Sequence, residues 1–203
     1  MIKTIYFDVG NVLIFFSRPQ MMAQLSSCTG LSINQLYHFL FEQKLLEKYE
    51  TGKITTEQLY HSIQSLSPRE FSLQELLDAA STIFTPNTEL WPLVEALKKA
   101  RIRLILLSNI SECHFNRISS DYPIIQTFDH KILSYEVGAT KPNPLIFQKA
   151  LAHSRCSPSE CFYTDDVPEF IAGARKVGLD GEIFTDVPSL RKILIVRGCK
   201  FLA

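Results

Sequence analysis

The stretch YFDVGNVLIFF, residues 6–16, is almost entirely apolar but contains one carboxylate, that of Asp8. It overlaps the segment IKTIYFD, residues 2–8, in which β-branched and aromatic side chains predict a buried strand. Gly10 follows two residues after the acid and indicates a turn. The sequence therefore places an acid at the carboxyl end of a buried strand, which is where open α/β sheets bind their ligands.

Downstream of this strand, predicted strands and helices alternate. Continuous apolar runs predict strands at residues 102–109, 129–134, 160–166 and 181–184. Helical periods predict helices at residues 89–100, 142–154, 169–178 and 189–196. Alternating strands and helices predict a protein of the α/β class with a doubly wound parallel sheet, similar to a Rossmann fold.

The segment between residues 17 and 87 interrupts this alternation. It has no strand pattern but contains helical patterns separated by Gly and Pro residues, such as INQLYHFLFEQKLLEKY at 33–49 and TTEQLYHSIQSL at 55–66. An all-helical insertion between the first and second strands of the sheet explains this composition. We therefore expect a core domain formed by residues 1–16 and 88–203 and a helical cap domain formed by residues 17–87.

Charge and composition narrow the range of partners. Lys+Arg and Asp+Glu residues number 21 each, so the formal net charge is zero and no basic excess points to nucleic acid. The five cysteines are scattered and include no CxxC pair, as is typical of a reducing compartment. Asp8 interrupts the first apolar stretch, and no apolar run is long enough to span a bilayer. We expect a cytoplasmic protein without a membrane or nucleic-acid partner, whereas the oligomeric state is not predicted.

Groups capable of chemistry follow several of the predicted strands. They are Asp8, Ser108, Lys141 and the pair Asp165–Asp166. Each has an ordinary structural explanation when taken alone, because Asp and Ser commonly cap helices or turns and Lys is usually a solvated surface residue. The predicted fold, however, brings all of them to one edge of the sheet.

Three carboxylates that converge at one edge repel one another unless a cation lies between them. A divalent cation with oxygen ligands, most commonly Mg²⁺, satisfies this requirement. Such a cation would also admit a phosphoryl group, whose remaining oxygens Lys141 and the hydroxyl of Ser108 can bind. Asp8 would then be a nucleophile suited to in-line attack on phosphorus. The pattern favours phosphoryl transfer through an aspartyl-phosphate, with a small phosphorylated metabolite as the substrate.

Four segments resemble, in order, the four motifs of the haloacid dehalogenase-like hydrolase superfamily. They are DVGNV from Asp8, LILLSN ending at Asn109, GATKPNPLIFQKAL around Lys141, and YTDDVPEFIAGA around Asp165 and Asp166. The resemblance covers essentially the whole chain. The insertion is similar to the family's helical cap of the first type, which often contains a segment like YETGKITTEQLYHSI at 49–63. The D-x-G-N-V form resembles sugar-phosphate phosphatases and the phosphatase domain joined to some epoxide hydrolases.

The resemblance implies a Mg²⁺ site. Asp8 would be the nucleophile and a metal ligand, together with the backbone carbonyl of Gly10 and the carboxylate of Asp166. Asp165 would bind the metal directly or through water. Phe170 departs from the family pattern, because relatives often place Asp or Asn there to orient the metal-binding acid. Its simplest explanation is a core residue on an amphipathic helix.

The resemblance also implies a phosphate and substrate site. Ser108 and Lys141 would bind phosphate, and Lys141 would also keep Asp8 ionised. Asn11 and Asn109 would help to bind the substrate. Ordinary packing or solvent exposure remains the simpler explanation for the cap side chains that we consider for contact with the leaving group, which are Phe16, Tyr49, Glu50 and Lys53.

Gly10 is a second departure from the family pattern. Phosphatases of the family usually carry a second Asp two residues after the nucleophile, which protonates the leaving group and later activates water. General acid–base help typically contributes about 10²–10⁴ in rate, so its loss slows the reaction without abolishing it. The sugar-phosphate-like relatives carry the same Gly. An anomeric phosphate, whose leaving hydroxyl has a low pKa, would depend on this acid least.

Two other functions remain open. Haloacid dehalogenases attack carbon through the same Asp without a metal, but they prefer a bulky aromatic residue where Gly10 stands, and the pair Asp165–Asp166 favours the metal-dependent reaction. A catalytically weak phosphate-binding protein would keep the same fold and site. A receiver-type signalling domain also uses Asp, Ser or Thr and Lys, but its phospho-acceptor follows a later strand and it has no helical insertion near its start.

Overall fold

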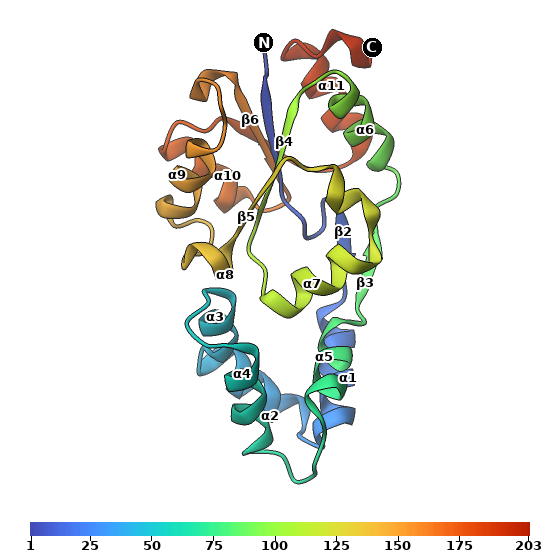
Figure 1. Ribbon diagram of the computed structural model, residues 1–203, viewed down its shortest axis with the longest axis vertical. Helices are drawn as coiled ribbons and strands as arrows, with labels where there is room; N and C mark the ends of the chain where they lie inside the picture. Colours follow the sequence, from blue (N-terminus) through green and yellow to red (C-terminus); the bar gives the residue numbers. More distant parts are fainter.

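The computed structural model describes all residues from 1 to 203, and its core is a five-stranded sheet (Figure 1). All neighbouring strands in this sheet run parallel. The order of the strands across the sheet is β5 (His130–Leu133), β4 (Arg103–Ser108), β1 (Thr4–Phe7), β6 (Cys161–Asp165) and β7 (Gly181–Ile183). The five strands predicted from apolar runs are therefore all present, each within one or two residues of its expected limits.

Helices cover both faces of the sheet, because the central strands are apolar on both sides. In β1, Ile5 and Phe7 belong to one apolar cluster, whereas Tyr6 belongs to another. The first cluster includes buried residues of α6 (Trp91–Lys99), α7 (Glu112–Asp121) and α11 (Val187–Val196). The second includes buried residues of α9 (Pro144–Ala152) and α10 (Pro168–Lys176). The expected α/β fold with a doubly wound parallel sheet is confirmed.

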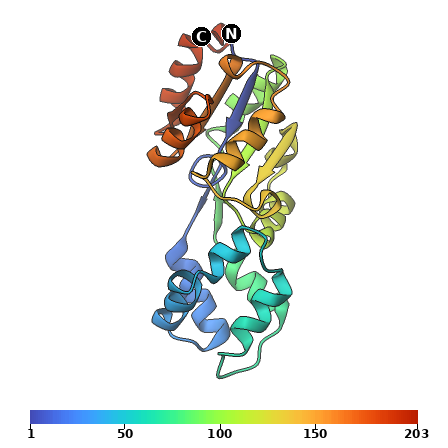
Figure 2. The same ribbon diagram turned by 90° about the vertical axis from the view of Figure 1, so that its left-hand side faces the viewer.

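A second group of helices, residues 18–81, lies at the end of the molecule opposite to the chain termini (Figures 1 and 2). This helical unit has its own apolar core of 13 buried residues, among them Leu36 and Ile63. Its helices are α1 (Arg18–Thr29), α2 (Ile33–Tyr37), the π-helical turn η1 (His38–Glu42), α3 (Leu45–Glu50), α4 (Thr56–Gln64) and α5 (Leu73–Ser81).

Two short strands connect the helical unit to the sheet (Figure 2). β2 (Ile14–Phe16) pairs with β3 (Phe84–Pro86) in antiparallel orientation. The expectation that residues 17–87 contain no strand is therefore wrong at the C-terminal end of that segment. The strand β3 has only three residues and ends in a proline, so it is too short to show an alternation of apolar and polar side chains. Its pairing partner β2 is also distant in the sequence.

The remaining short elements connect these parts. They are α8 (Ser134–Val137) and the 3₁₀ turns η2 (Pro123–Thr127), η3 (Pro158–Glu160) and η4 (Lys200–Leu202). None of the helices combines the length and the apolar character needed to cross a bilayer.

Candidate active site

The candidate site residues lie at the carboxyl edge of the sheet because the central strands end in register. Phe7, the last residue of β1, is paired with Leu106 of β4 and with Thr164 of β6. Asp8 therefore emerges beside Ser108, the last residue of β4, and Asp165, the last residue of β6. The fold brings together side chains that are more than 150 positions apart in the sequence.

Three carboxylates converge at this edge. Oxygen atoms of Asp8, Asp165 and Asp166 all lie within 4.8 Å of one another. Asp8 and Asp165 are buried, whereas Asp166 is partly exposed. Burial raises the pKa of Asp8 above its usual value, an effect that the ammonium group of Lys141 opposes and the charge of Asp165 reinforces.

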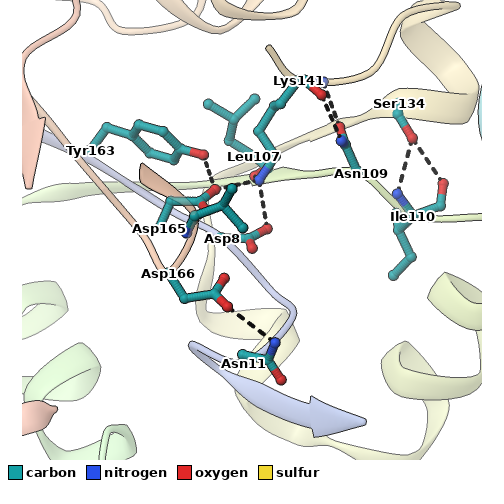
Figure 3. A network of polar contacts seen from close by, with 11 residues as sticks. Asp8, Asn11, Leu107, Asn109, Ile110, Ser134, Lys141, Tyr163, Asp165 and Asp166 are labelled. Carbon is teal, nitrogen blue, oxygen red and sulfur yellow. Dashed lines mark hydrogen bonds and ion pairs between the residues drawn. The ribbon is translucent and has the colours of Figure 1, made fainter. Parts of the chain in front are cut away.

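Lys141 is buried among these acids (Figure 3). Its Nζ atom lies 2.8 Å from Oδ1 of Asp8 and 2.6 Å from Oδ2 of Asp165, and it also donates to the carbonyl of Leu107 at 3.1 Å. Burial lowers the pKa of Lys141, but the two carboxylates more than offset this effect, so the net pKa lies above its ordinary value. One ammonium group thus pairs with two of the three carboxylates.

Asp165 differs from the two other acids in its surroundings. Its Oδ2 accepts hydrogen bonds from Lys141 and from the hydroxyl of Tyr163, and its Oδ1 accepts one from the backbone N–H of Val167 at 2.8 Å. Both oxygens are therefore engaged by protein donors. Asp8 and Asp166 line the neighbouring cavity, and Asp165 does not.

Two asparagines connect the loops of the site (Figure 3). Asn11 has a left-handed backbone with φ of 54°, which Asn tolerates better than most residues, and its Nδ2 donates to Oδ2 of Asp166 at 3.1 Å. The side chain of Asn109 donates to the carbonyl of Lys141 at 3.0 Å and accepts from its N–H at 2.7 Å. Asn109 therefore holds the loop that carries Lys141, although it also lines the cavity.

A cavity of about 310 Å³ lies between the sheet and the helical unit. Gly10, Ser108 and Lys141 of the core line this cavity. The connecting strands and the helical unit contribute Phe16, Arg18, Met21, Leu46, Glu50 and Phe84. The cavity is thus partly apolar, with charged groups at both ends.

The four side chains named from the sequence for contact with the leaving group differ in whether they line the cavity. Phe16 and Glu50 line the cavity, whereas Tyr49 and Lys53 do not. The hydroxyl of Tyr49 is hydrogen-bonded to Thr56 at 2.8 Å and accepts from the backbone N–H of Cys113 in α7 at 3.1 Å. Arg18 and His114 also line the cavity but were not considered, because neither lies in a motif and no local pattern marks them.

Phe170 does not lie in the apolar core, contrary to its simplest explanation from the sequence. It lines the cavity, and its ring centroid lies 4.9 Å from Nζ of Lys141. An aromatic face attracts a cation at this distance. Phe170 thus packs against the buried ammonium group.

The donor set fits a divalent cation. Three carboxylates and one ammonium group sum to a charge of minus two, and oxygens of Asp8 and Asp166 face the cavity.

Residues 2–178 match the family described as haloacid dehalogenase-like hydrolase. Over 191 residues the chain is 27% identical to the D-ribitol-5-phosphate phosphatase of Bacteroides thetaiotaomicron, with 89% of this chain and 90% of that protein covered. It is 25% identical to a sesquiterpene phosphatase of Aspergillus oryzae, with 91% and 90% covered. Its fold is similar to that of an aspartate-to-alanine variant of a HAD family enzyme of Bacteroides thetaiotaomicron, solved with magnesium and inorganic phosphate (TM-score 0.82, 21% identity, 94% and 99% of the two chains covered). Because the family match spans most of its length, the chain belongs to the haloacid dehalogenase-like hydrolases.

Proposed function

We propose that the protein is a Mg²⁺-dependent phosphatase that hydrolyses a small phosphorylated metabolite, such as a sugar or polyol phosphate. The observation that carries this proposal is the arrangement of charges: Lys141 pairs with Asp8 and Asp165, and Asp8 and Asp166 line the cavity. The two relatives described above as phosphatases support the same activity.

In this proposal, Mg²⁺ is held by Asp8, Asp166 and the backbone carbonyl of Gly10. The cation supplies charge neutralisation for the phosphoryl group and for the surrounding acids. Asp8 attacks phosphorus in line with the leaving oxygen and forms an aspartyl-phosphate, which water then hydrolyses. Asp165 contributes as the partner of Lys141 and would bind the metal directly or through water.

Lys141 and Ser108 bind the phosphoryl oxygens in this proposal. Lys141 also favours the ionised form of Asp8, since its ammonium group lies 2.8 Å from that carboxylate. Asn109 acts on the substrate through the loop of Lys141, and Asn11 acts through Asp166, because their side chains are hydrogen-bonded to these two residues.

We further propose that residues 17–87 act as a cap domain of the first type over a core domain formed by residues 1–16 and 88–203, as in the D-x-G-N-V branch of the family. The separate apolar core of the helical unit and the cavity beneath it support this division. A cap that closes over the cavity excludes water from the phosphoryl group. The free cysteines are consistent with a cytoplasmic location.

Hydrolysis of p-nitrophenyl phosphate, followed with Mg²⁺ and with EDTA, tests this function. We expect hydrolysis only with Mg²⁺ and its loss in Asp8→Asn, because an amide is a far poorer nucleophile than a carboxylate. Asp121→Asn, which removes an exposed acid that does not line the cavity, is the matched control. Activity that survives in Asp8→Asn would exclude the mechanism. Metal-independent release of halide from 2-chloropropionate would instead identify a dehalogenase.

A further inference from the structure

The position that carries the general acid in related phosphatases has no side chain in this protein. Gly10 occupies it, and a Cβ atom added there would lie 3.2 Å from Cε1 of Phe16. The ring of Phe16 thus crowds this position. A residue that gives the leaving group its proton must therefore be another one that lines the cavity.

The titratable groups at the edge of the sheet do not provide this proton. Asp8 is the proposed nucleophile, and Asp166 is a proposed metal ligand that accepts a hydrogen bond from Asn11. Lys141 donates to three acceptors, two of them carboxylates, which hold its protons in place.

Three titratable groups remain around the cavity. Arg18 stays protonated near neutral pH because guanidinium is a very weak acid. His114 donates from Nε2 to the carbonyl of Ala80 at 3.1 Å, and burial lowers its pKa to about 4, so it carries no extra proton at neutral pH. Glu50 is the one carboxyl group that the helical unit contributes to the cavity, and it forms no ion pair.

Glu50 is held in place by close packing of the helical unit against the core. It is the last residue of α3, and Figure 1 shows α3 directly opposite α8. Two residues later, Gly52 approaches α8 so closely that a Cβ atom there would lie 2.2 Å from the carbonyl oxygen of Tyr135. This contact, which only a glycine with φ of 64° permits, positions the end of α3 over the cavity.

We propose that Glu50 is the general acid and base of the reaction, a role that rests on the phosphatase function proposed above. In the first step, Asp8 forms a bond to phosphorus, the bond from phosphorus to the ester oxygen breaks, and the Glu50 carboxyl gives its proton to that oxygen. In the second step, the Glu50 carboxylate takes a proton from water, the water oxygen bonds to phosphorus, and the bond to Asp8 breaks. Alcohol and phosphate are released, and Glu50 is protonated again.

The environment of Glu50 suits both steps. Burial raises its pKa to about 7, while the guanidinium of Arg18 opposes this shift and the charge of Glu47 adds to it. Near neutral pH both the acid and its conjugate base are therefore populated, as a group that alternates between the two roles requires. Glu50 would allow hydrolysis of alkyl phosphates, whose leaving alkoxides need a proton, and not only of anomeric phosphates.

Glu50→Gln, compared on two substrates, tests the proposal. The leaving phenolate of p-nitrophenyl phosphate needs little protonation, whereas the alkoxide of ribitol 5-phosphate needs it fully. We expect kcat/KM, which reports the first step, to fall by about 10²–10⁴ for ribitol 5-phosphate and to remain nearly unchanged for p-nitrophenyl phosphate. For the aryl ester, kcat should fall and a burst of p-nitrophenol should precede the steady state, because hydrolysis of the aspartyl-phosphate then lacks its base.

Glu70→Gln, which removes an exposed acid of the helical unit that does not line the cavity, is the matched control and should leave the hydrolysis of both substrates unaffected. An equal loss of kcat/KM for both substrates, or no loss for either, would overturn the role of Glu50 and leave the phosphatase function intact. If the parent protein hydrolyses neither substrate, the proposed function itself fails. Circular dichroism of the Gln variant separates these outcomes from misfolding.

Discussion

The Nζ atom of Lys141 lies 2.8 Å from Oδ1 of Asp8, and more than nine-tenths of each side chain is buried. The same ammonium group lies 2.6 Å from the fully buried carboxylate of Asp165. Ion pairs exposed to water contribute little to the stability of a protein. A buried charge, in contrast, depends on its partner to offset the free-energy cost of removing it from water. The stability of this edge of the sheet and its proposed chemistry therefore depend on one lysine.

Lys141→Met should destabilise the protein by about 3–5 kcal/mol, because it leaves two buried carboxylates without their cation. Urea unfolding measures the free energy difference. Mg²⁺ should restore part of the loss by neutralising the acids. Lys149→Met, which removes an exposed lysine from α9, is the control. Equal unfolding free energies for the two variants would contradict the inferred dependence on Lys141.

Asp166→Asn should weaken Mg²⁺ binding at least tenfold, since substitutions around metal sites typically cost about 10–100-fold even beyond the direct ligands. Titration calorimetry with Mg²⁺ alone measures the affinity without requiring turnover. Glu169→Gln removes an exposed acid three residues away and should have no effect. Unchanged affinity in Asp166→Asn would place the metal elsewhere.

Gly10→Ala should cost about 1 kcal/mol of stability, at the low end for overpacking, because the contacted ring of Phe16 is 39% exposed and can move aside. In a Phe16→Ala background the cost should disappear. A double-mutant cycle of unfolding free energies measures the coupling between the two sites. Additive effects would show that the ring does not restrict position 10.

The partly buried His114 should make the free energy of unfolding depend on pH in the acid range. Its pKa falls from 6.5 in the unfolded chain to about 4 in the folded protein. As the pH drops from 6.5 toward 4, the unfolded state gains a proton that the folded state resists, so the unfolding free energy decreases, by at most about 3 kcal/mol.

His114→Gln should lack this contribution, and the difference between the two proteins in urea unfolding between pH 7 and pH 4 isolates it. The raised pKa of Glu50 acts in the opposite direction over part of this range. It is present in both proteins and cancels in the difference. Parallel pH profiles would show that His114 is not desolvated in the folded protein.

The sequence by itself determined the parallel sheet and the edge at which Asp8, Ser108 and Asp165 meet. Continuous apolar runs predict strands that are buried on both faces, and parallel strands bring their carboxyl ends to one edge. These signals are local, because they depend only on the residue types within each strand. The short strand β3 was missed because its existence depends on pairing with β2 rather than on its own composition.

Only the tertiary structure decided which of the neighbouring side chains face the cavity. Asp165 and Asp166 are adjacent and chemically identical, yet Asp165 is enclosed by Lys141 and Tyr163 while Asp166 lines the cavity. The adjacent pair Tyr49 and Glu50 differs in the same way, because the Tyr49 hydroxyl is hydrogen-bonded to Thr56 and Cys113 whereas Glu50 lines the cavity. Periodicity predicts that one side of a strand or helix is buried, but the group that it meets there belongs to a distant segment, and packing alone selects that partner.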